Sequence, residues 1–263
     1  MALTLAHVSD LHVGQDREDG GARSVRRARQ VIDYLNGLPG ELDGILVTGD
    51  LADHGTADEY RTVAEILATA RFPVLTCPGN HDERVAYQRA LLGVEDDAGA
   101  PVNHVHRVGG VTVAMCDSTI PGQDDGLLDD TTLSWLDKVL IDAPADEPAL
   151  VCFHHPPVRL HIPYVDTIRQ HGAERLAEVL AAHENVAAVL CGHAHTAAAA
   201  TFAGRPLVVA PGVVSTVLLP FESTPRGLLD GVPAPTVDYE FPPSVAFHVL
   251  DDDGGLVTHF RSV

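Results

Sequence analysis

Short apolar runs alternate with longer segments of helical spacing along most of the chain. Each run is rich in aliphatic or β-branched side chains and ends at turn residues, which is typical of a strand buried on both faces. The predicted strands are Leu3–Val8, Ile45–Thr48, Val74–Cys77, Val111–Cys116, Leu150–Phe153 and Val186–Cys191. This alternation predicts an α/β protein built from βαβ units.

The segments between these runs carry apolar residues at helical spacing. One of them starts at Thr56, where Thr-Ala-Asp-Glu59 has the spacing of a capping box. The other predicted helices are Ser24–Leu38, Asp82–Leu92, Thr131–Ile141 and Ala173–His183.

The pattern changes after Gly192, where strands follow one another through turns. These strands are Ala197–Phe202, Leu207–Ala210, Val245–Leu250 and Leu256–Phe260. They predict an antiparallel meander, which could form a second sheet packed on the first. Leu218–Pro243 is rich in Pro and Gly and has no clear period, so we expect a long loop there. That loop could form a lid over a site or a contact between the subunits of a homodimer.

Composition narrows the class of protein. The chain has 263 residues with 45% hydrophobic and 21% charged, which is ordinary for a globular protein, and one domain is expected. Its 37 acidic and 17 basic residues give a net charge of −20, which argues against a nucleic-acid polymer or an anionic membrane as partner. Neither a leader-like segment nor an apolar stretch of about 18 residues is visible, so we expect a cytoplasmic protein.

Residues that can bind metal ions follow five of the predicted strands. They are Asp10-Leu-His12, Gly49-Asp50, Gly79-Asn80-His81-Asp82, His154-His155 and Gly192-His193-Ala194-His195. Ligand sites in α/β sheets lie beyond the carboxyl ends of strands, so these clusters are expected to meet. We expect Gly14, Gly49, Gly79 and Gly192 to supply the backbone bends that turn the side chains inward.

The donor atoms indicate which ions would bind. Imidazole nitrogens with carboxylate or amide oxygens suit Fe, Mn, Zn or Co, and there are too many donors for one such ion. Two divalent or mixed-valence ions that share a bridging carboxylate fit the count. A pair about 3.5–4 Å apart stabilises the attacking and leaving oxygens of phosphoryl transfer, and a hydroxide bridging the ions would be the nucleophile.

The motif series D-x-H, G-D, G-N-H-[DE], a later His and G-H-x-H occurs here in order, from Leu5 to about Pro211. In this the chain resembles the calcineurin-like metallophosphoesterase superfamily. Gly49-Asp50-Leu-Ala-Asp53 and His154-His155-Pro156-Pro157 are similar to its branch of bacterial class III cyclic-nucleotide phosphodiesterases and glycerophosphodiesterases. The resemblance implies a four-layer αββα sandwich.

The same resemblance implies a role for each residue. Asp10, His12 and His195 would hold the first ion, Asn80, His154 and His193 the second, and Asp50 would bridge them. His81 would remain unligated beside the phosphate, as a transition-state stabiliser or general acid. His155 and Asp82 would orient the ligands. Asp53 could do the same, or could cap a helix or order a loop.

The expected activity is hydrolysis of small phosphodiesters, with 3′,5′-cyclic nucleotides as candidate substrates. A phosphomonoesterase or phosphoprotein phosphatase is the alternative enzyme, and a scaffold that keeps the fold without catalysis is the alternative outside enzymes. Asp124 and Asp125 would disfavour additional phosphates if they face the site. His161 is a further candidate for substrate contact, and His7 is expected to be structural within the first strand.

Overall fold

The computed structural model describes residues 2–95, 99–144, 146–224, 227–251 and 253–263. The main strands are β1 Leu3–Val8, β2 Gly44–Thr48, β3 Val74–Cys77, β4 His104–Val108, β5 Val111–Met115, β7 Ala149–Cys152, β9 Val186–Cys191, β10 Ala198–Phe202, β11 Arg205–Val209, β16 Ser244–Leu250 and β17 Leu256–Ser262. The helices are α1 Ala22–Asn36, α2 Ala57–Leu67, α3 Arg84–Tyr87, the π-helical turn η1 Gln88–Leu92, α4 Asp130–Asp142, α5 Pro163–Thr167 and α6 Ala173–Ala181. Two-residue strands complete the set: β6 Gly126–Leu127, β8 Gln170–His171, β12 Thr216–Val217, β13 Leu228–Leu229, β14 Val232–Pro233 and β15 Val237–Asp238.

Two mixed sheets form the centre of the molecule. One has the order β17-β16-β1-β2-β3, with β1, β2 and β3 parallel and the last two strands of the chain antiparallel at its edge. The other has the order β10-β11-β9-β7-β5-β4, with a parallel centre and antiparallel strands at both edges. The parallel strands of both sheets are mostly buried, as their continuous apolar runs require.

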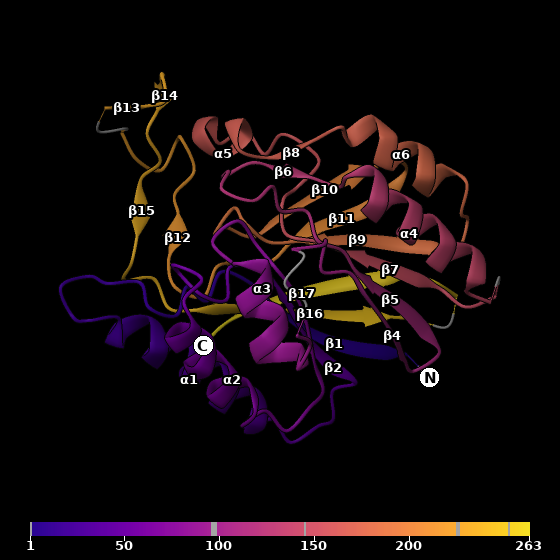
Figure 1. Cartoon of the computed structure of the whole chain (residues 1–263), viewed down its shortest axis with the longest axis horizontal. Coiled ribbons are helices and arrows are strands. Elements are labelled where there is room, and N and C mark those ends of the chain that lie inside the picture. Colours follow the sequence, from indigo (N-terminus) through magenta and orange to yellow (C-terminus); the bar gives the residue numbers. More distant parts are fainter. Residues whose placement is uncertain (1, 96–98, 145, 225–226, 252) are drawn as a thin grey trace.

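The layers are helix, sheet, sheet and helix (Figure 1). Helices α1 and α2 pack on the first sheet through residues such as Val31 and Val63. Helices α4 and α6 pack on the second through residues such as Leu136 and Leu180. Leu5 and Leu46 of the first sheet meet Leu150 and Leu190 of the second in a third apolar cluster. The expected αββα sandwich is confirmed.

The predicted meander is wrong. The strand pair β10–β11 extends the second sheet through parallel pairing with β9, whereas β16–β17 extends the first through antiparallel pairing with β1. Each hairpin covers the exposed edge of an existing sheet, and local strand patterns carry no information about which edge that is. The edge strand β4 was missed because half-buried and exposed positions alternate along its polar sequence.

The segment at Asp82–Leu92 begins its helix two residues later than expected. Glu83 caps it, with its carboxylate accepting hydrogen bonds from the backbone N–H groups of Val85 and Ala86. By contrast, the capping box of Thr56 and Glu59 is confirmed at the start of α2.

The segment 218–243 is more ordered than the predicted loop. Strand β12 pairs with β15, and β13 pairs with β14 at a tip that projects from the body in Figure 1. Residues 225 and 226 of this segment lie outside the described residues.

None of the helices in the described ranges is long and apolar enough to cross a bilayer.

Candidate metal centre

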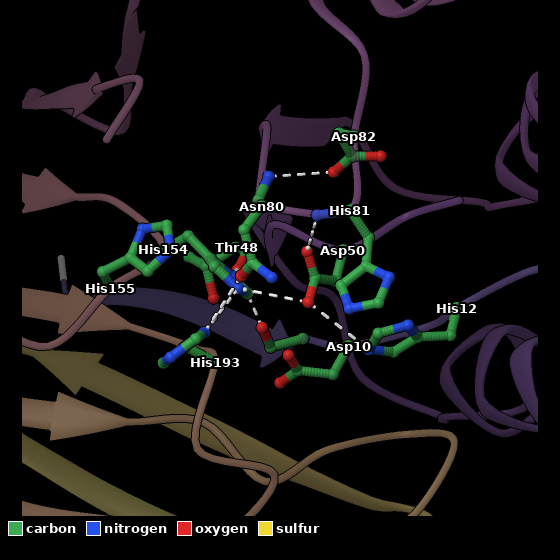
Figure 2. A network of polar contacts seen from close by, with 12 residues as sticks. Asp10, His12, Thr48, Asp50, Asn80, His81, Asp82, His154, His155 and His193 are labelled. Atoms are coloured by element: carbon green, nitrogen blue, oxygen red, sulfur yellow. Dashed lines mark hydrogen bonds and ion pairs between the residues drawn. The ribbon is translucent and has the colours of Figure 1, made fainter. Parts of the chain in front are cut away.

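The predicted donor residues come together at the carboxyl ends of five strands. Asp10, Asp50 and Asn80 follow β1, β2 and β3, while His154 and His193 follow β7 and β9. Figure 2 shows the side chains of Asp10, His12, Asp50, His154 and His193 pointing toward one region. The site therefore lies where the two sheets meet, and residues far apart in the sequence become neighbours.

The backbone turns sharply at the donor residues themselves. Five of them have the left-handed conformation with φ between 44° and 71°: Asp10, His12, Asp50, His193 and His195. This conformation is uncommon outside glycine and concentrates at functional sites. Gly14 and Gly49 have the positive φ expected of them, but Gly79 and Gly192 do not. These two make room instead, since a Cβ at Gly79 would collide with Asp50 and one at Gly192 with Ser9.

The first half of the site contains Asp10, His12, Asp50 and His195, whose donor atoms lie within 4.8 Å of one another. His12 Nε2 is 3.1 Å from His195 Nε2 and 3.3 Å from Asp50 Oδ2. The Nδ1–H of His12 donates to Asp53 at 2.8 Å, so neutral His12 presents the lone pair of Nε2 to the cluster. His195 Nδ1 hydrogen bonds with Ser215 Oγ at 2.8 Å.

The second half joins the first through Asp50. His154 Nε2 lies 3.3 Å from Asp50 Oδ2 and 3.2 Å from His193 Nδ1, which is 3.1 Å from Asn80 Oδ1. The Nδ1–H of His154 donates to the Thr48 carbonyl at 2.7 Å, so the Nε2 of neutral His154 faces the cluster as well. Thr48 stands two residues before Asp50, and sequence reasoning missed it because the contact uses the backbone.

Unpaired polar atoms show that these residues fit metal ions. Both carboxylate oxygens of fully buried Asp10 have no hydrogen-bond partner among the described residues, and the ring nitrogens of His12 and His195 face each other at 3.1 Å. Such groups are costly to bury, and two nitrogen lone pairs cannot hydrogen bond to each other. A cation between the facing nitrogens of His12 and His195 would satisfy both lone pairs. The mixed nitrogen and oxygen donors suit first-row transition ions. The cluster thus supports two metal ions.

Electrostatics favour positive charge at the same place. Burial would lower the pKa of His154, but Asp50 outweighs it and raises that pKa to about 9. The pKa of His12 is also raised, because Asp50, Asp53 and Asp10 outweigh its burial. Burial would raise the pKa of Asp50, yet His154 and His12 hold it well below its usual value. A metal cation would take the place of these protons.

The proposed orienting residues contact the donors or their loops. Asp82 accepts hydrogen bonds from the N–H groups of Leu51, Ala52 and Gly79, and so ties the loop after β2 to the loop after β3. Tyr60 O–H also donates to Asp82, at 2.9 Å. Burial and the nearby Asp50 raise the pKa of Asp82 to about 6. Of the roles left open for Asp53, the structure shows the contact with His12.

His155 lies beside the donors, with its ring 4.6 Å from that of His193. Its donor atom falls within 4.8 Å of those of His154 and His193, which would allow it to be a ligand. Both ring nitrogens are already used, however, by Ser118 Oγ at 2.8 Å and the Asp124 carbonyl at 3.2 Å. This geometry favours the orienting role.

His81 differs from the other histidines of the site because its side chain is 40% exposed. Its backbone N–H donates to Asp50 Oδ1 at 3.0 Å, and its Nδ1–H donates to the Asp53 carbonyl at 2.8 Å. The ring packs edge-on against His12 with centroids 4.5 Å apart. Nε2 is therefore the ring nitrogen that can serve a substrate.

A cavity of about 320 Å³ opens over these residues. Asp124, which was considered from the sequence, lines this cavity, and Asp125 is not part of the described lining. The rest of the lining was not named from the sequence: Gln15, Tyr164, Val165, Ile168, Ser215, Val217, Pro235, Val237 and Tyr239. Pro235, Val237 and Tyr239 belong to the predicted loop, so that segment does reach the site. Tyr164, rather than the expected His161, lines the cavity.

The comparisons with known proteins agree with this geometry. The model of the calcineurin-like phosphoesterase family matches residues 3–197. The chain belongs to this family. A probable cyclic nucleotide phosphodiesterase of Rhodococcus erythropolis is 34% identical over 81% of this chain and 71% of its own length. The glycerophosphodiester phosphodiesterase GpdQ of Enterobacter lignolyticus is 30% identical over 84% of this chain and 81% of its own.

Solved structures show the family's fold. A dimetal phosphatase from Danio rerio superposes with a TM-score of 0.65 at 15% identity, covering 97% of this chain and 98% of its own. A purple acid phosphatase from yellow lupin superposes with a TM-score of 0.68 at 14% identity, covering 100% of this chain and 52% of its own. At these identities the likeness speaks for the fold alone.

Proposed function

We propose that this metal-dependent phosphoesterase hydrolyses small phosphodiesters, with 3′,5′-cyclic nucleotides among its substrates. The observation that carries the proposal is the pair of half-sites joined by Asp50, with the carboxylate of Asp10 buried and without a hydrogen bond. The names of relatives, which are cyclic-nucleotide and glycerophosphodiester phosphodiesterases, support the same substrate class.

The proposed ligand assignment follows the two half-sites. Asp10, His12 and His195 would hold one ion, and Asn80, His154 and His193 would hold the other, with Asp50 contacting both. Fe, Mn, Zn and Co are the candidate ions. When bound, the two ions would polarise the phosphate oxygens and supply a nucleophile near neutral pH.

The other residues prepare the reaction. Asp53 and the Thr48 carbonyl fix the rings of His12 and His154 so that Nε2 faces the centre. His81 is held at Nδ1 by the Asp53 carbonyl, so its imidazolium would donate the Nε2 proton to the leaving oxygen. Asp82 keeps the loops of Asp50 and Asn80 together.

The cavity favours diesters over monoesters. Val165, Ile168, Val217 and Val237 give it an apolar lining that a second organic substituent can contact. Of its lining residues that the structure describes, none is Lys or Arg, so the second charge of a monoester would find no ammonium or guanidinium group there. A phosphomonoesterase is therefore the second candidate, and the presence of every predicted donor disfavours a non-catalytic scaffold.

A substrate panel tests the proposal. The protein would be loaded separately with Mn, Fe, Co and Zn and assayed with bis(p-nitrophenyl) phosphate, p-nitrophenyl phosphate and a set of cyclic nucleotides. We expect faster hydrolysis of the diester than of the monoester with at least one ion. Hydrolysis of the monoester alone would favour the phosphatase, and no hydrolysis with any ion would contradict an enzymatic role.

Three further predictions concern the whole protein. We propose that the enzyme is cytoplasmic. We also propose that it binds neither nucleic-acid polymers nor membranes, which its net charge of −20 supports. Size-exclusion chromatography would distinguish a monomer from the homodimer that segment 218–243 could form.

A further inference from the structure

Besides Asp50, Asp124 is the acidic residue in the described lining of the cavity. This exposed residue precedes β6, and its carbonyl accepts the hydrogen bond of His155 Nε2 at 3.2 Å. Because the ring of His155 lies 4.6 Å from that of His193, position 124 is tied to the metal centre.

Tyr164 of α5 lines the same cavity near Asp124. Its partial burial raises its pKa, and the negative charges of Asp124 and then Asp230 add to that shift. This part of the wall therefore combines an aromatic ring with negative potential. The combination attracts ammonium groups, through cation–π contact and charge, and repels anions.

Two arginines pack against another residue of the cavity wall, Tyr239. The guanidinium groups of Arg17 and Arg23 lie 3.8 and 5.5 Å from the ring centroid of Tyr239, and Arg23 also donates to the Val214 carbonyl. Within the described ranges, no basic side chain forms an ion pair with Asp124. The negative charge of Asp124 can therefore interact with a ligand in the cavity.

We propose that Asp124 selects substrates by charge. The site would prefer phosphodiesters whose second alcohol is cationic or neutral, and would reject those with a further anionic group. The inference rests on the proposed function, because it concerns the substituent of the diester that the metal centre hydrolyses. Charge selection acts through binding, so it should appear in KM more than in kcat.

Two p-nitrophenyl diesters of equal shape test this charge selection. One carries choline and the other 3,3-dimethylbutanol, in which carbon replaces the charged nitrogen. The kcat/KM ratio of the choline ester to its neutral partner would be measured with the Mn-loaded full chain. We expect Asp124→Asn to lower this ratio about three- to tenfold at low salt, and less at high salt.

Asp125→Asn is the matched control. It removes the same charge one residue away, but Asp125 pairs with His171 at 2.6 Å and is not part of the cavity lining. This variant should keep most of the charge preference. Metal content and thermal midpoint would be measured for both variants, so that a loss of folding is recognised.

The outcomes separate the two proposals. If the wild-type chain hydrolyses both esters and Asp124→Asn leaves their ratio unchanged, or if Asp125→Asn lowers it equally, charge selection by Asp124 is wrong. If the metal-loaded wild type hydrolyses neither ester, the proposed phosphodiesterase activity itself has failed.

Discussion

The protein buries two groups of histidines, one within the first sheet and one where the two sheets meet, and they differ in how their ring nitrogens are paired. His7 of β1 and His248 of β16 hydrogen bond to each other at 2.9 Å. Their other nitrogens bond to Thr48 Oγ1 and Thr258 Oγ1, both at 2.8 Å. At the metal centre, by contrast, the imidazole nitrogens of His12 and His195 face each other beside the carboxylate of Asp10, which has no hydrogen bond and lies 3.5 Å from His195 Nε2.

The difference shows that burial alone does not mark a metal ligand. His7 and His248 lie within regular strands, and burial lowers both pKa values, that of His248 to about 4. Five of the seven predicted donor residues lie in left-handed turns, and carboxylates raise the pKa values of His12 and His154, whereas burial lowers those of His193 and His195. A histidine whose nitrogens are all satisfied by the protein is structural, whereas convergent unsatisfied nitrogens require a cation.

The largest effect is expected at Asp50, which contacts both halves of the centre. Asp50→Asn keeps the size of the side chain but removes its charge, so both ions should bind more weakly and kcat/KM should fall roughly a thousandfold or more. Metal analysis and steady-state kinetics measure this. His248→Gln is the matched control from the structural pair and should retain the metal content of the wild type. Two full equivalents of metal in the Asp50 variant would contradict the proposal that Asp50 binds both ions.

His81 should separate catalysis from metal binding. We expect His81→Asn to lower kcat about 100- to 10,000-fold, as loss of a general acid does, with metal content near that of the wild type. The same metal analysis and kinetics would be used. Loss of metal from this variant would show that His81 belongs with the ligands.

The structural pair should make stability depend on pH. The pKa of His248 is about 4 when folded and 6.5 when unfolded, so between these values only the unfolded chain takes up the proton. The contribution of His248 to the free energy of unfolding is complete above pH 6.5. About 3 kcal/mol of it is lost as the pH falls toward 4.

Urea unfolding at pH 7 and pH 5 measures the part of this loss that occurs above pH 5, about 2 kcal/mol. The difference between wild type and His248→Gln isolates it from the titration of the metal centre. An equal loss of stability in both proteins on acidification would contradict the prediction.

The smallest effect is expected from the carboxylate that orients His12. Asp53→Asn should weaken metal binding about 10- to 100-fold, because the amide no longer favours the tautomer with the Nε2 lone pair toward the centre. Competition with a metal chelator provides the measurement. Asp58→Asn, on the exposed side of α2, is a control for the charge change alone. Equal weakening in both variants would argue against an orienting role.

The donor set could be predicted because each motif follows a buried strand, and the ends of parallel strands share an edge. The partners that fix the donors could not, since Thr48 acts through its carbonyl and Ser215 lies beyond the motif series, which ends at about Pro211. The possibility of a lid formed by segment 218–243 was left open, but its contact residues could not be named, because the pairing of β12 with β15 places Val237 and the adjacent Tyr239. Strand pairing also decided the position of β16, which no local pattern indicates.

The central claim is that Asp50 joins two metal ions held by different residues. Anomalous diffraction from crystals of the Mn- or Zn-loaded protein tests it most directly. We predict two peaks that both contact Asp50, one beside Asp10, His12 and His195 and the other beside Asn80, His154 and His193. A single peak, or a second ion bound by His155 in place of Asn80, would contradict the assignment.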